Sequence, residues 1–193
     1  MSQAALVKAA KAMSEGLRAL TERRLAGKID SDAWYDGAYD EIHDGHLAAW
    51  LAGRQMAGVD GPVDDDDRRQ ARRLADFQSE YLDNFRDKLD DGGYEGDGDA
   101  AKAGQRCDLY ALSIRGSASE AWASSQNEDD EIDWVLGDAE HCDDCIALAA
   151  QSPYTGNTLY AYPGQGDTEC GMHCHCHLAT ASGEGPKRIS LYP

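Results

Sequence analysis

Long apolar runs are missing from this chain of 193 residues. No stretch approaches the roughly 20 consecutive apolar residues that a membrane-spanning helix requires, so we expect no membrane partner. The N-terminus does not resemble a signal peptide either, because Lys8 and Lys11 interrupt the short apolar stretch at residues 4–7. We therefore expect a protein that is made and kept in the cytoplasm, where clustered cysteines favour metal binding over disulfides.

Lysine is scarce, and acidic residues outnumber basic ones. The 36 Asp and Glu residues, most of them Asp, oppose 18 Lys and Arg and give a formal net charge of −18. Repulsion of this size disfavours a compact chain unless salt screens it. We interpret the Asp-rich, Lys-poor composition as halophilic. An ordinary acidic solvated surface and an acidic face that docks on a basic partner are the alternatives.

A basic surface for nucleic acid is missing as well. Contact with phosphates requires a patch of Lys and Arg, so we expect no direct sequence-specific binding of nucleic acid. The densest basic cluster, Arg68-Arg69 with Arg72-Arg73, follows four consecutive aspartates at residues 64–67. Because the spacing is that of helical i, i+4 neighbours, we interpret this cluster as internal salt pairing.

The first 126 residues have the apolar spacing of helices, with steps of three and four. The pattern predicts about four of them. The expected buried positions are Leu6, Ala10, Met13, Leu17 and Leu20 before a stop at Gly27; Tyr35, Tyr39, Ile42, His46 and Trp50 after an N-cap at Ser31; Leu74, Phe77, Tyr81, Phe85 and Leu89 before Gly92; and Ala103, Cys107, Tyr110, Ile114 and Ala121.

Three features of these helices are best explained by packing. Cys107 lies on an apolar stripe and is expected to be a buried core thiol. His43 and His46 lie one turn apart, and we interpret them as packed or rim histidines rather than ligands. The glycines of the second helix lower its helicity by up to about 1 kcal/mol each and permit close contact between helices.

The metal-binding side chains are concentrated in the last third of the chain. Five of the six cysteines and four of the six histidines fall within residues 141–177. The CxxC pair Cys142 and Cys145 is followed at a distance by Cys170, Cys174 and Cys176, which is typical of a structural zinc site.

The choice of four ligands stays open at this point. Two intervening residues let the sulfurs of the CxxC pair turn to one side of a tight turn. The second pair comes from Cys170, Cys174 and Cys176, with His141 and His173 as substitutes. Cys174 and Cys176 would share one face of an extended segment. A disulfide within the cluster and unpaired free thiols are the alternatives, whereas a redox CxxC is disfavoured because no thioredoxin-like strand and helix surround it.

Short strands are expected around this cluster, at residues 134–136 and, more weakly, at 158–162, with one helix after Cys142. A module this small rarely stabilises itself by apolar burial alone. A structural zinc ion would supply on the order of 10 kcal/mol. The predicted fold is therefore mainly α: a helical region at residues 1–126, a small α+β Cys/His module at 127–182 and a C-terminal tail at 183–193.

The order of these parts resembles the minor head proteins, also called head morphogenesis proteins, of tailed phages and archaeal tailed viruses, in the broad Mu protein F-like group. The resemblance is most specific over residues 134–178 and looser upstream. The family often has an arginine between the last two cysteines, where this chain has His175. The positions that carry the resemblance are Trp134, 141–145, 159–163, Gly166, Cys170 and 174–178.

This resemblance implies a non-enzymatic structural or assembly component of the virion head, made in the host cytoplasm. Its helices would bind the portal or the major capsid protein, in multiple copies per virion. The alternatives are a cellular zinc-module adaptor and a zinc hydrolase or nuclease, although the excess of thiolates favours a closed structural site. The hydrolase would use His173, His175 and His177 with Asp143, Asp144, Asp167 or Glu169.

Overall fold

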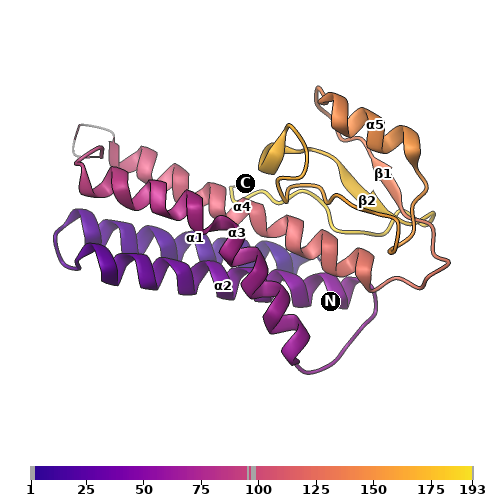
Figure 1. The fold of residues 1–193 in the computed structure, drawn as a ribbon, viewed down its shortest axis with the longest axis horizontal. Helices are drawn as coiled ribbons and strands as arrows, with labels where there is room; N and C mark the ends of the chain where they lie inside the picture. The colour runs from indigo at the N-terminus through magenta and orange to yellow at the C-terminus, as the bar shows by residue number, and fades with distance from the viewer. Residues whose placement is uncertain (1–2, 95, 97–98, 193) are drawn as a thin grey trace.

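The chain folds into four long helices followed by a small mixed region, as Figure 1 shows. The computed structural model describes residues 3–94, 96 and 99–192. The elements are α1 (Gln3–Leu25), α2 (Ser31–Met56), α3 (Asp65–Asp90), α4 (Asp99–Ser124), β1 (Asp133–Val135), α5 (Asp143–Gln151), the short 3-10 helix η1 (Gly171–His173) and β2 (His177–Ala179). The predicted class, mainly helical with a small strand-containing Cys-rich C-terminal region, is confirmed.

Local side-chain chemistry sets the ends of the helices. The predicted N-cap at Ser31 is wrong by one residue, because the Asp30 carboxylate accepts the hydrogen bond from the Ala33 backbone N–H. The Ser31 hydroxyl instead donates to Asp90 at the end of α3. At the start of α3, Asp64 and Asp67 form a reciprocal capping box, which satisfies two backbone donors that the helix leaves unpaired.

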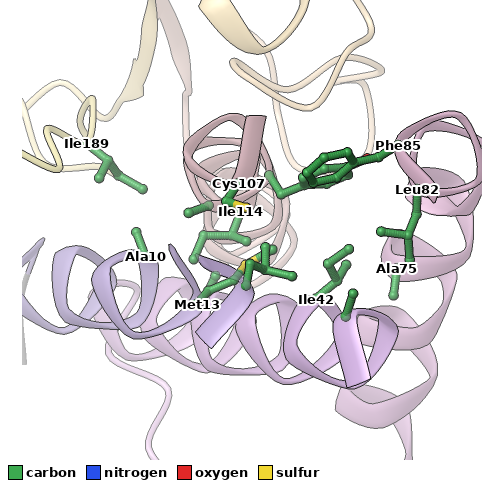
Figure 2. Packing of buried hydrophobic residues seen from close by; sticks show 14 of the residues in the cluster. Ala10, Met13, Ile42, Ala75, Leu82, Phe85, Cys107, Ile114 and Ile189 are labelled. Carbon is green, nitrogen blue, oxygen red and sulfur yellow. The ribbon is translucent and has the colours of Figure 1, made fainter. Parts of the chain in front are cut away.

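The core of the bundle lies between the apolar stripes of the four helices (Figure 2). Met13, Ile42 and Ile114 belong to this core, and Cys107 is buried in it as predicted. Gly53 of α2 lies directly against the backbone of Ala118 in α4, where a Cβ atom would collide. The expectation that glycine permits close helix contact therefore holds at this crossing.

The stripe on α3 differs from the prediction. Phe77 and Tyr81 are 57% and 51% exposed, whereas Gln78 and Leu82 are buried in their place. The amide of Gln78 donates to Ser113 of α4, so a polar residue occupies the face of α3 that points into the bundle. The other predicted positions of this stripe, Leu74, Phe85 and Leu89, are buried as expected.

The arginine cluster on α3 forms internal ion pairs, as expected, but the partners differ. Only Arg69 pairs locally, with Asp66 at i, i+3. Arg73 reaches Glu120 of α4, and the buried Asp67 accepts from Arg54 of α2 at 2.6 Å. The pairs of Arg73 with Glu120 and of Arg54 with Asp67 connect helices and therefore fix how α3 packs against α4 and α2.

The C-terminal region rests on α4 (Figure 1). Strands β1 and β2 pair antiparallel, with Trp134 opposite Leu178, and Trp122 of α4 packs into the same apolar cluster. The first predicted strand and the predicted helix after Cys142 are present. The second predicted strand, at 158–162, is wrong, although Leu159 is buried and Tyr160 exposed as its alternation required.

The end of the chain returns to the helices. Gln3 near the start of α1 hydrogen-bonds the backbone of Lys187, and Ile189 is buried against the bundle core. The Tyr192 hydroxyl donates to Asp108 of α4 at 2.6 Å. Residues 187–192 thus lie against the bundle. None of the helices in the described ranges is long and apolar enough to cross a membrane.

A buried histidine makes the bundle sensitive to acid. His46 is 2% exposed, and its Nδ1 lies 2.6 Å from the Ser117 hydroxyl. Burial lowers the pKa of His46 from 6.5 to about 4, so the ring is neutral in the folded protein. An unfolded chain binds this proton already near pH 6.5. The folded state therefore loses stability as the pH falls from 6.5 towards 4.

We predict that His46→Gln flattens this pH dependence, because glutamine can bond Ser117 without titrating. Up to about 3 kcal/mol of unfolding free energy separates pH 6.5 from pH 4 through this one group. The measurement is denaturant unfolding of wild type and variant across that range at fixed high salt. Equal slopes for the two proteins would contradict the assignment.

Candidate metal centre

The five cysteines of the C-terminal region converge from three segments. Cys142 caps the start of α5 and Cys145 lies in its first turn, so the CxxC spacing brings both to one end of a helix. Cys170 and Cys174 flank the short helix η1, and Cys176 immediately precedes β2. The structure thus brings together all five of the cysteines that the sequence singles out.

The sulfur atoms form two overlapping groups that share Cys145. One contains Cys142, Cys145 and Cys170, and the other Cys145, Cys174 and Cys176; within each group the sulfurs lie within 4.8 Å of one another. Cys145 Sγ is 3.5 Å from Cys170 Sγ and 3.6 Å from Cys174 Sγ. All six cysteines of the chain are free thiols. This arrangement can hold a metal ion.

Hydrogen bonds outside the sulfur cluster hold its loop in place. The Asp144 carboxylate accepts from the backbone N–H of Glu169 at 2.8 Å and so ties the loop before η1 to α5. The Thr168 hydroxyl lies 3.3 Å from Cys170 Sγ. Such contacts orient ligands before a metal ion arrives.

His141 lies beside the cluster with a defined orientation. Its Nε2 is 2.9 Å from the Gly137 carbonyl oxygen, which can only accept, so Nε2 carries the proton. Its Nδ1 is then an acceptor, 3.7 Å from Cys176 Sγ. Of the two substitute ligands expected from the sequence, His141 contacts a thiol, whereas His173 is exposed and belongs to neither sulfur group.

Two of the buried thiols, Cys145 and Cys174, are poorly ionised by themselves. Burial raises the pKa of Cys145 far above its ordinary value, and a hydrogen bond to Cys176 together with burial raises the pKa of Cys174. Thiolate, not thiol, is the ligand form. A metal ion would therefore have to displace these protons and supply the positive charge that stabilises the thiolates.

The residues of the alternative hydrolase site do not gather. His177 is paired in β2 opposite Val135, and Asp144 is engaged with the backbone of Glu169. Asp167 accepts from the Tyr162 backbone. In the described part of the chain, the groups that can hold a metal consist of cysteines alone.

Sequence reasoning missed Arg115, which reaches the cluster from α4. This arginine is 3% exposed and donates to the backbone oxygens of Cys174 at 2.7 Å and Cys176 at 3.3 Å. Burial lowers its pKa, and the neighbouring Cys174 opposes that shift. One feature of the sequence could have identified it. Arg115 lies in a helix segment of small and apolar residues, which predicts that the whole segment is buried and that the arginine cannot reach solvent.

Fold and site together define a helical protein that carries a Cys-rich candidate metal centre. Comparison with models of known families, with curated proteins and with solved structures found no match to the chain. The donor chemistry is clear nevertheless, because thiolates are soft ligands that favour zinc, copper(I) and iron–sulfur clusters over magnesium or calcium.

We predict that Cys145→Ser abolishes stoichiometric metal binding, because it removes a soft ligand from both sulfur groups. Cys107→Ser is the matched control, since that thiol is equally buried but lies in the bundle core. Titration with Co²⁺, followed by thiolate-to-metal charge transfer, reports binding. Wild-type binding by the Cys145 variant, or its loss in the Cys107 variant, would exclude the cluster as the metal centre.

Proposed function

We propose that this protein is a non-enzymatic structural component of a tailed-virus head, with a C-terminal module held together by one zinc ion. The observation that carries the proposal is the cluster of five thiols, which is built on the framework that resembles minor head proteins. The long helices α1–α4 provide the surface that binds the portal or the major capsid protein.

Zinc fits the two sulfur–sulfur separations measured from Cys145. Four sulfurs bonded to zinc at about 2.3 Å lie about 3.8 Å apart, close to the separations from Cys145 to Cys170 and Cys174. We assign Cys142, Cys145, Cys170 and Cys174 as the ligands. Cys176 has another partner, the Nδ1 of His141, to which its thiol can donate.

A four-thiolate set supports a structural role. Catalytic zinc keeps an open position for water and is usually bound by histidine and carboxylate, whereas closed structural sites fill all four positions with protein ligands. Here the thiols alone are sufficient for a closed shell. The ion would connect α5 to the loop around η1. Through β2 it would also connect α5 to α4.

The partner surface is proposed at the exposed aromatic residues of α3. Phe77 and Tyr81 line a cavity of about 670 Å³ between α3, α4 and the loop that contains Cys170 and Met172. Large apolar side chains grouped beside a concave surface are typical of protein–protein contacts. The strongly acidic chain would repel packaged DNA rather than bind it.

The ligand assignment makes a prediction for two cysteines of the cluster. Cys142→Ser should lower zinc content below one ion per chain, whereas Cys176→Ser should retain one ion, because Cys176 lies outside the proposed set. Zinc per chain is measured by elemental mass spectrometry after purification in high salt. The reverse pattern would favour the group of Cys145, Cys174 and Cys176.

The assembly role predicts that Phe77→Ser combined with Tyr81→Ser lowers incorporation into heads at least about tenfold, since two central apolar contacts are lost. Tyr160→Ser is the matched control, because this tyrosine is 65% exposed on the C-terminal region. The assay is co-expression with the portal and major capsid proteins of the same virus, followed by quantification in purified heads. Wild-type protein that never enters heads would refute the virion role and leave a cellular adaptor.

A further inference from the structure

Arg115 is a buried cation with no carboxylate partner in the described residues. Its neighbours on α4 are small and apolar, whereas other arginines of the bundle pair with carboxylates, as Arg18 does with Asp108 and Arg54 with Asp67. Arg115 takes part in none of the ion pairs between described residues.

Neutral acceptors alone satisfy its hydrogen bonds. The guanidinium Nη2 donates to the Cys174 carbonyl at 2.7 Å and Nη1 to the Cys176 carbonyl at 3.3 Å. Carbonyl dipoles pair the N–H groups but leave the charge itself uncompensated. A buried charge without a counter-charge is costly, so the position calls for an anion close by.

Two glycines leave room for this guanidinium and for the loop beside it. Gly164 has φ +86°, a backbone conformation that favours glycine, and a Cβ atom there would lie 2.9 Å from Arg115 Nε. Gly116, the next residue on α4, lets the loop at Gln165 approach the helix without a side chain between them. The Arg115 side chain is therefore enclosed between the loop at Gly164 and the segment that carries Cys174 and Cys176.

We propose that Arg115 is the counter-ion of a doubly negative four-thiolate metal centre, and that its positive charge selects four cysteines over sets that include the neutral His141. This rests on the proposed zinc site. A divalent ion with four thiolates leaves two negative charges, whereas three thiolates and one histidine leave a single negative charge. The hydrogen bond to the Cys174 carbonyl places the charge next to a proposed ligand, and the bond to the Cys176 carbonyl holds the segment that follows it, which makes Arg115 a positioning residue.

Two substitutions separate the charge from the hydrogen bonds. Arg115→Lys keeps the charge, and Arg115→Gln keeps a donor for one carbonyl without the charge. Arg106→Gln is the matched control, since Arg106 also lies on α4 and donates to a backbone carbonyl, that of Tyr81 at 2.8 Å. Zn²⁺ affinity of the full chain is measured in high salt by competition with a chromophoric chelator.

We expect Arg115→Gln to weaken Zn²⁺ binding by about 10- to 100-fold, the usual effect of losing a group that supports metal ligands. Arg115→Lys should lose clearly less, and Arg106→Gln should match the wild type. The Co²⁺ spectrum of Arg115→Gln should also shift towards a site with one nitrogen ligand, a change that a merely structural arginine would not cause.

Equal losses in the Lys and Gln variants, or wild-type affinity in the Gln variant, would overturn the role of the charge while the zinc site stands. A wild type that binds no Zn²⁺ would overturn the zinc site itself. Far-UV circular dichroism checks that each variant keeps its helices. If Arg115→Gln does not fold, Gly164→Ala replaces it: displacing the guanidinium should weaken Zn²⁺ binding, and unchanged affinity there would equally contradict the proposal.

Discussion

The C-terminal region is organised around the sulfur atom of Cys145. Cys170 and Cys174 approach it from the loop on either side of η1, while Cys142 shares its helix end. The region has one short helix, two strands of three residues and an apolar cluster that it shares with Trp122 of α4. A region with so little secondary structure rarely holds one conformation by packing alone, so we infer that metal binding at the thiols adds stabilisation.

Helix α4 connects this region to the bundle. One face of α4 carries Cys107 and Ile114 into the helical core, and Trp122 near its end packs into the C-terminal cluster. Arg115 lies between these two regions and bonds the loop that holds the last cysteines. Contacts therefore run from the candidate metal centre to α4 and, through the ion pair between Glu120 and Arg73, on to α3.

Periodicity and cysteine spacing made much of the structure predictable. The helical stripes follow from side-chain geometry that is local in sequence, and the CxxC pair needed only the first turn of α5 to bring its sulfurs together. The resemblance to minor head proteins stays a prediction. Asp30 and Ser31 show the limit of local rules, since either residue can cap a helix and only the observed geometry chooses between them.

Contacts between distant segments could not be predicted. Phe77 was expected in the core because it is apolar and has the helical spacing, but the packing of α3 against α2 and α4 buries Gln78 instead. Arg115 carries no motif, and its role depends on a loop about 60 residues further along the chain. The strand His177–Ala179 was not predicted, because its partner Asp133–Val135 lies far away in sequence.

X-ray absorption at the zinc edge, on full-length protein purified in high salt, tests the central claim most directly. The account predicts one zinc ion per chain with four sulfur neighbours at about 2.3 Å and no nitrogen or oxygen in the first coordination sphere. A mixed shell with nitrogen or oxygen ligands, or a folded protein without zinc, would contradict it.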